Sequence, residues 1–193
     1  MMMKKHVLFI HGGGEGAYEE DALLAASLQD ALGKAYEVHY PRMPEEDSAE
    51  YGDWIAVITA ARADLDGAVT LVGHSVGGSV LLNFLCEEQM EKPVAGLFVI
   101  ATPFWGADSF WKWDEAQLPQ DAAARMANIP RIFFYHNQDD EVVPFAHLAQ
   151  YEAILPQTEL PQVVFRAFDA GGHQFNNDLS AVAADIIAAE TAQ

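Results

Sequence analysis

The sequence contains only one cysteine, Cys86, among its 193 residues. A single thiol cannot form a disulfide within the chain, which excludes the class of small domains held together by disulfide frameworks. Cys86 falls on the apolar side of a predicted helix. We therefore expect a buried and unreactive thiol at this position.

Basic residues are scarce as well. The chain has 10 lysines and arginines against 29 aspartates and glutamates, which gives a net charge of −19. A field of this sign repels nucleic acids and anionic membrane surfaces, and it disfavours polyanionic substrates. We expect a small-molecule partner, and neither nucleic acid nor a membrane.

Long hydrophobic runs are absent near the N-terminus. The apolar run at residues 7–10 is too short for a signal peptide or a membrane span, so we expect a cytoplasmic protein. No linker, repeat or low-complexity tract divides the chain, and its hydrophobic content of 51% is typical of globular proteins. We predict a single domain over residues 1–193.

What the sequence does contain is a regular alternation of strand-like and helix-like segments. Short, continuous apolar runs are typical of strands buried on both faces, and the stretches between them have the apolar spacing of helices. The six predicted strands are residues 6–10, 36–40, 68–72, 96–101, 131–136 and 162–168. This order predicts an α/β fold with a mostly parallel six-stranded sheet and helices on both faces.

One connection between predicted strands is much longer than the others. Residues 102–130 follow the fourth strand and hold three of the four tryptophans in the chain. Long connections in a compact domain are usually functional. We predict that this aromatic-rich insertion forms a small cap over an apolar pocket, with Trp105, Phe110 and Trp111 in contact with the substrate. The alternative is an aromatic cluster that only packs on the edge of the sheet.

A motif after the third predicted strand carries the chemistry. Gly73, Ser75 and Gly77 fit the pattern G-x-S-x-G between a strand-like and a helix-like run. A serine on so tight a turn needs glycine two residues away on either side, because larger side chains would clash. The turn also directs the first free N–H groups of the helix toward the serine. The pattern predicts a nucleophilic serine; the alternative is a glycine-rich turn with a bystander serine.

A serine nucleophile needs a base within hydrogen-bond reach and an acid that orients this base. Asp139 and Asp140 follow the fifth predicted strand, and His173 follows the sixth, directly after two glycines. Because the carboxyl ends of parallel strands meet at one edge of the sheet, we expect these side chains to lie near Ser75. The order Ser, Asp, His along the chain is that of an α/β-sheet catalytic triad.

Together, these motifs resemble the α/β-hydrolase superfamily, and within it the small, nearly lidless serine hydrolases of the YdeN type. The resemblance rests on four motifs in family order that span residues 11–173. They are His-Gly-Gly-Gly at residues 11–14, the G-x-S-x-G motif at residues 73–77 (here called the serine turn), Asp-x-x-Val-Pro at residues 140–144, and Gly-Gly-His at residues 171–173. The resemblance implies an α/β-hydrolase fold.

The resemblance also implies a role for each member of the triad. Ser75 is the expected nucleophile, and His173 is the expected general base and then general acid. The family places its acid four residues before a proline, here Pro144, which favours Asp140 and leaves Asp139 as the alternative.

An oxyanion hole is implied at the same site. We expect it to use the N–H of Val76 and one N–H of the glycine run, with Gly13 favoured and Gly12 and Gly14 as alternatives.

We therefore expect a serine hydrolase of the carboxylesterase type that cleaves a small, uncharged, apolar acyl ester through an acyl-enzyme. Thioester, lactone, amide or C–C hydrolysis on the same scaffold, and a non-catalytic binding protein, are the alternatives. No cofactor is expected, because the glycine run fits neither G-x-G-x-x-G nor G-K-[ST]. No metal is expected, because no histidines have the spacing of a metal-binding motif.

Overall fold

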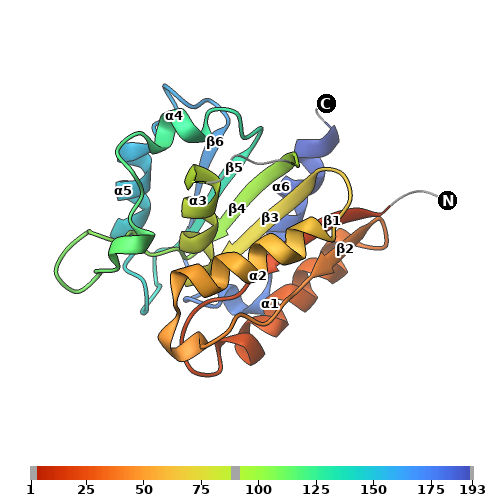
Figure 1. Cartoon of the computed structure of the whole chain (residues 1–193), viewed down its shortest axis with the longest axis horizontal. Helices are drawn as coiled ribbons and strands as arrows, with labels where there is room; N and C mark the ends of the chain where they lie inside the picture. Colours follow the sequence, from red (N-terminus) through yellow and green to blue (C-terminus); the bar gives the residue numbers. More distant parts are fainter. Residues whose placement is uncertain (1–3, 88–91, 192–193) are drawn as a thin grey trace.

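The computed structural model describes residues 4–87 and 92–191, which form one six-stranded sheet in the order β2-β1-β3-β4-β5-β6 (Figure 1). Every neighbouring pair of strands is parallel. The strands are β1 (Lys5–Ile10), β2 (Tyr36–His39), β3 (Val69–His74), β4 (Val94–Ile100), β5 (Ile132–Asn137) and β6 (Val163–Phe168). The predicted α/β class is confirmed, and the sheet is wholly parallel.

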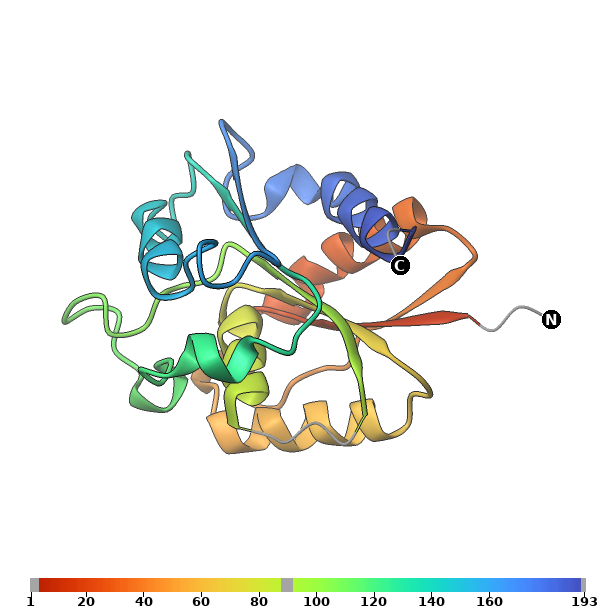
Figure 2. The same cartoon turned by 90° about the horizontal axis from the view of Figure 1, so that it is seen from above.

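Helices cover both faces of this sheet, as predicted. They are α1 (Ala17–Leu32), α2 (Tyr51–Ala63), α3 (Val76–Glu87), α4 (Ala122–Met126), α5 (Ala146–Ile154) and α6 (Ser180–Thr191). Short 3-10 turns lie at Glu46–Ser48, Asp114–Ala116 and Phe175–Asn177. Figure 2 shows α1 and α6 on one side of the sheet and α2 and α3 on the other.

The two faces of the sheet carry two separate cores, because successive strand residues point to opposite sides. In β1, Leu8 packs in the core that includes Trp54 of α2, whereas Phe9 packs in the core that includes Leu24 of α1. All four of these side chains are fully buried. This double burial explains why the strands read as continuous apolar runs.

The topology creates one switch point, between β1 and β3. The chain leaves β1 toward β2 on one side and later passes from β3 toward β6 on the other. Ligands of open α/β sheets bind outside the carboxyl ends of the strands at such a point. The glycine run after β1 and the serine turn after β3 both lie there.

The lone cysteine, Cys86 of α3, is buried, as expected. Burial raises the pKa of its thiol to about 12, so the reactive thiolate is scarce at neutral pH. In the described part of the chain, no helix has the length and apolar character needed to cross a membrane.

Candidate active site

Ser75 lies on a sharp turn between β3 and α3 with a backbone φ of 51°, a left-handed conformation that is unusual for a residue with a side chain. A Cβ atom at Gly73 would lie 2.6 Å from the Cα of Gly78, and one at Gly77 would lie 2.3 Å from the His11 carbonyl oxygen. Both glycines of the motif are therefore required by close backbone approaches.

His173 and Asp140 meet at the carboxyl edge of the sheet, although 33 residues separate them in the sequence. His173 lies in the loop at residues 169–174, here called the histidine loop, and its Nδ1 donates to the Asp140 carboxylate. The distances are 2.9 Å to Oδ2 and 3.1 Å to Oδ1. Because Nδ1 carries the proton, the lone pair of a neutral ring lies on Nε2, as a general base requires.

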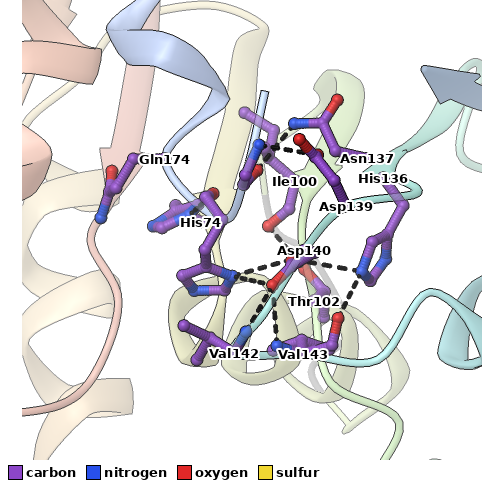
Figure 3. Close-up of polar contacts among 12 residues, drawn as sticks. His74, Ile100, Thr102, His136, Asn137, Asp139, Asp140, Val142, Val143 and Gln174 are labelled. Carbon is purple, nitrogen blue, oxygen red and sulfur yellow. Dashed lines mark hydrogen bonds and ion pairs between the residues drawn. The ribbon is translucent and has the colours of Figure 1, made fainter. Parts of the chain in front are cut away.

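The Asp140 side chain is fully buried and accepts several further hydrogen bonds (Figure 3). Its Oδ1 accepts the N–H groups of Val142 and Val143 at 2.9 and 2.8 Å, and its Oδ2 lies 3.3 Å from Nε2 of His136. Burial raises the pKa of Asp140, but the contacts with His136 and His173 and the backbone donors outweigh burial and lower it well below the usual range. Asp140 is therefore ionised at neutral pH.

Asp139, the alternative acid, has a different set of contacts. Its exposed carboxylate accepts the N–H groups of Gly171 and Gly172 at 3.2 and 2.9 Å. The Asn137 amide donates to the carbonyl oxygen of Gly172 at 2.7 Å. Asp139 therefore holds the backbone of the histidine loop, whereas the imidazole contact belongs to Asp140.

The His173 ring has the properties of a base at neutral pH. Burial lowers its pKa, and the nearby His74 adds to this effect against the opposing pull of Asp140. Among the described residues, neither Nε2 of His173 nor the hydroxyl of Ser75 has a hydrogen-bond partner. Contacts between a nucleophile and its base often tighten only when substrate binds.

The glycine loop (residues 11–14) packs against the first turn of α3. The buried His11 accepts the N–H of Met43 on Nε2 at 2.8 Å and donates from Nδ1 to the Gly12 carbonyl at 2.7 Å, which fixes the loop. A Cβ at Gly13 would lie 3.0 Å from Cγ2 of Val76. Within the described residues, the N–H groups of Gly13 and Val76 donate to no protein acceptor. Two backbone donors are thus available beside Ser75.

The two alternative donors in the glycine loop differ in their surroundings. The N–H of Gly12 already donates to Oδ2 of Asp21 at 2.7 Å. Gly14 has a φ of 115°, and a Cβ added to it would meet nothing within 4 Å. Among the three glycines of the loop, Gly13 is the one whose added Cβ would meet Val76 of α3.

A cavity of about 300 Å³ opens beside Gly13 and Val76. Its walls include Trp105, Lys112 and Trp113 from the long connection, together with residues 47–49. Nε1 of Trp105 is buried and has no hydrogen-bond partner among the described residues. The cavity therefore combines aromatic walls with the charged side chains of Lys112 and Asp47, next to the available backbone N–H groups.

The other two aromatic residues predicted to contact substrate lie elsewhere on the long connection. Phe110 is 82% exposed. Trp111 packs edge-on against Phe110 and His147, with ring centroids 5.4 and 4.9 Å apart. Neither Phe110 nor Trp111 lines this cavity, whereas Trp105 does.

A second hollow, of about 640 Å³, lies on the side of His173. Glu20, Asp139 and Glu141 line it, and its walls include no lysine or arginine. The electrostatic character of the site is therefore asymmetric, with carboxylates concentrated near His173.

One group of side chains has the spacing of a metal site, and it lies away from Ser75. His6, Glu37 and His39, on the β1–β2 edge of the sheet, offer ligand atoms within 4.8 Å of one another. The two histidines already contact each other at 3.0 Å, and Lys4 lies 3.5 Å from Glu37. In the described residues, no such group includes Ser75, Asp140 or His173.

A family model described as the alpha/beta hydrolase family matches residues 7–189, which is nearly the whole chain. The chain belongs to this family. Its predicted resemblance to the α/β hydrolases is thereby confirmed. A search of curated proteins finds no match to this α/β hydrolase.

Solved structures share the fold of this α/β hydrolase at low sequence identity. The ydeN gene product from B. subtilis has a TM-score of 0.79 at 17% identity, covering 97% of this chain and 100% of its own. A serine hydrolase involved in carbazole degradation has a TM-score of 0.70 at 15% identity, covering 98% and 92%. The esterase domain of a Rhodothermus marinus protein has a TM-score of 0.66 at 17% identity, covering 97% and 86%.

Several residues that shape this site were not singled out from the sequence. His136 contacts Asp140, the same carboxylate that His173 contacts. Trp113 and Lys112 line the cavity beside Gly13 and Val76. Asp21 and His74 form a buried pair at 2.8 Å. A lone acid on the inner face of α1 is the one sequence signal that could have indicated this pair, because an unpaired buried carboxylate is costly.

Proposed function

We propose that this α/β hydrolase is a serine hydrolase that cleaves carboxylic esters through an acyl-enzyme. The observation that carries the proposal is the buried Asp140–His173 pair at 2.9 Å, on the same edge of the sheet as Ser75 on its strained turn. A triad has three parts: a buried carboxylate, an imidazole whose Nε2 has no partner within the described part of the chain, and a serine on a sharp strand-to-helix turn.

Each side chain then has a defined step in the reaction. The Ser75 Oγ attacks the ester carbonyl carbon while Nε2 of His173 takes the hydroxyl proton. Asp140 stabilises the resulting imidazolium, and His173 returns the proton to the departing alcohol. Water attacks the acyl-enzyme in the reverse sense and releases the acid. The N–H groups of Gly13 and Val76 hold the oxyanion, since neither has an acceptor among the residues that the structure describes.

The two hollows support a division of the substrate. The cavity of about 300 Å³ beside Gly13 and Val76 suits a small, uncharged acyl group between Trp105 and Trp113. The hollow beside His173 suits the leaving alcohol, because His173 is the residue that protonates it. Carboxylates of Glu20, Asp139 and Glu141 line that side and would repel an anionic leaving group. Esters of neutral alcohols are favoured over thioesters with polyanionic carriers.

The scaffold also supports lactone, amide and C–C bond hydrolysis, since fold does not determine the reaction. A binding protein with the same fold would not need all three groups together: a serine on the sharp turn after β3, an ionised buried aspartate and a neutral histidine. An activity test therefore separates these candidates.

The test is covalent labelling with a fluorophosphonate, which phosphonylates an activated serine. We expect wild type to be labelled and to hydrolyse p-nitrophenyl acetate and butyrate, and Ser75→Ala to lose labelling and about 10⁴-fold or more in kcat. Ser79→Ala is the matched control. Ser79 is a buried serine on α3 whose hydroxyl donates to the Pro103 carbonyl at 3.2 Å, and this variant should keep its activity. Equal labelling of wild type and Ser75→Ala would refute the proposal.

A further inference from the structure

A second buried Asp–His pair lies next to the triad and takes no part in the chemistry described above. Asp21 comes from α1 and His74 from the last position of β3, directly before Ser75. Oδ2 of Asp21 lies 2.8 Å from Nδ1 of His74, and each side chain is 1% exposed. Burying two ionisable groups is expensive unless each is paired and hydrogen-bonded.

The pair contacts all three loops that form the active site. Oδ2 of Asp21 accepts the N–H of Gly12 in the glycine loop at 2.7 Å. Its Oδ1 accepts the Gln174 amide of the histidine loop at 3.0 Å. Nε2 of His74 donates to the backbone carbonyl of His173 at 3.0 Å. The serine turn, the glycine loop and the histidine loop are thus joined through two side chains.

The hydrogen-bond partners determine the protonation state of His74. One ring nitrogen faces the Asp21 carboxylate and the other faces the His173 carbonyl, and both of these groups only accept hydrogen bonds. A neutral imidazole has only one donor nitrogen. Its other nitrogen would therefore direct a lone pair toward either the Asp21 carboxylate or the His173 carbonyl oxygen. The imidazolium satisfies both contacts.

The direction of the pKa shifts agrees with this reading. Burial alone lowers the pKa of His74, yet Asp21 and the His173 carbonyl raise it above the usual value. Burial raises the pKa of Asp21, but His74 and the donors of Gly12 and Gln174 lower it overall. Both directions favour the ion pair that the two acceptors around the His74 ring require.

We propose that Asp21 and His74, held as an ion pair, are positioning residues that lock the glycine loop and the histidine loop onto the serine turn. This inference rests on the proposed function, because the loops it aligns carry the proposed donors and base. A displacement of about 1 Å in such groups can cost about a hundredfold in rate. The pair acts through His173 and the glycine loop, without contact with the substrate.

The first experiment compares Asp21→Asn with the same substitution at another aspartate that accepts several hydrogen bonds, away from the active site. Asp185 of α6 accepts the Tyr135 hydroxyl at 2.8 Å and the Arg166 guanidinium at 2.6 Å, so Asp185→Asn breaks a network that supports no active-site loop. We expect Asp21→Asn to lower kcat for p-nitrophenyl butyrate by about tenfold to a hundredfold, with KM changed less than twofold. Asp185→Asn should lower Tm and leave kcat unchanged.

A pH profile gives a readout that a purely structural role would not move. The charges facing His173 are Asp140 from the loop after β5, His74 of β3 and Asp21 of α1. His74→Gln removes the cation and leaves Asp21 ionised, so the pKa of His173 should rise. The acid limb of kcat/KM should move to higher pH. In Asp21→Asn/His74→Gln both charges are gone, and the limb should return toward that of wild type.

The outcomes separate this inference from the proposed function. A kcat for Asp21→Asn within twofold of wild type, or an equal loss in Asp185→Asn, would overturn the positioning role. If the variants do not fold, ring-nitrogen NMR of wild-type His74 remains decisive: both nitrogens protonated at pH 7 supports the inference, and one bare nitrogen overturns it. If wild type is not labelled by fluorophosphonate, the proposed function fails, and the NMR result still tests the ion pair.

Discussion

The two buried Asp–His pairs have the same chemical groups at nearly the same separation, 2.9 Å for Asp140–His173 and 2.8 Å for Asp21–His74. Their histidines are nevertheless shifted in opposite directions. The pKa of His173 is lowered, chiefly by burial, whereas the pKa of His74 is raised because its partners outweigh burial.

The two histidines also differ at the second ring nitrogen. Nε2 of His74 is tied to a carbonyl oxygen, and Nε2 of His173 has no acceptor among the described residues. A carboxylate at one nitrogen therefore does not by itself determine whether a histidine acts as a base or as a fixed cation. The group at the other nitrogen and the neighbouring charges contribute as well.

The largest expected effect comes from removing the acid of the first pair. Asp140→Asn keeps the shape of the side chain but favours the wrong tautomer of His173, so kcat should fall by about 10³- to 10⁴-fold. The neighbouring Asp139→Asn is the control, because it loses only loop contacts and should cost less than tenfold. Equal losses in the two variants, measured as kcat for p-nitrophenyl acetate, would contradict the assignment of Asp140.

The neutral state of His173 predicts the pH dependence of the activity. A general base works only when deprotonated, so kcat/KM should fall about tenfold per pH unit on the acid side of its pKa. Since that pKa is lowered, the midpoint of the acid limb should lie below the ordinary value of about 6.5. An acid limb with a midpoint clearly above pH 6.5 would show that the general base is not a histidine with a lowered pKa, and so would contradict the role of His173.

The sequence predicted one of these two pairs and missed the other, for a physical reason. Asp139, Asp140 and His173 follow predicted strands, and parallel strands bring their carboxyl ends together, so topology indicates an Asp–His contact. The preference for Asp140 over Asp139 came from the family resemblance. Asp21 lies inside a helix and His74 inside the elbow motif, 53 residues apart. Only the packing of α1 against the sheet brings them together.

The long connection, residues 102–130, was also predicted only in part. Its aromatic composition predicts contact with substrate, which stays a prediction, and of the three rings named only Trp105 lines the cavity beside Gly13. The sequence of residues 102–130 could not predict which other aromatic rings face the cavity. Most of that segment lacks the regular apolar spacing of a helix or a strand, which would show which side chains lie on one face. Trp113 lines the cavity, and Phe110 projects into solvent.

Changing the wall of the cavity beside Gly13 and Val76 should leave both Asp–His pairs as they are. Trp113→Ala enlarges the cavity, so the preference among p-nitrophenyl esters should move severalfold toward longer acyl chains, with the acid limb of the pH profile unchanged. Phe110→Ala is the matched control and should leave the preference as it is, because that ring is 82% exposed. A shift in the Phe110 variant, or none in the Trp113 variant, would place the acyl group elsewhere.

The smallest effect is on stability at alkaline pH, and it distinguishes the pairs. Because the folded pKa of His74 is raised, its contribution is fully present below about pH 6.5 and is lost as pH rises through the folded pKa, at no more than about 1.4 kcal/mol per pH unit. His173, with a lowered pKa, adds no such loss. Denaturant unfolding from pH 6 to 10 should show this slope in wild type and a flatter one in His74→Gln.

The difference between the two histidines is tested most directly by one NMR titration of the wild-type protein that follows the ring nitrogens of both. We expect His173 to become neutral with a midpoint below about 6.5 and His74 with a midpoint above that value. The same order should hold in Ser75→Ala, in which no chemistry occurs. A His74 that titrates together with His173, or before it, would contradict the assignment of one pair as the base and the other as a fixed cation.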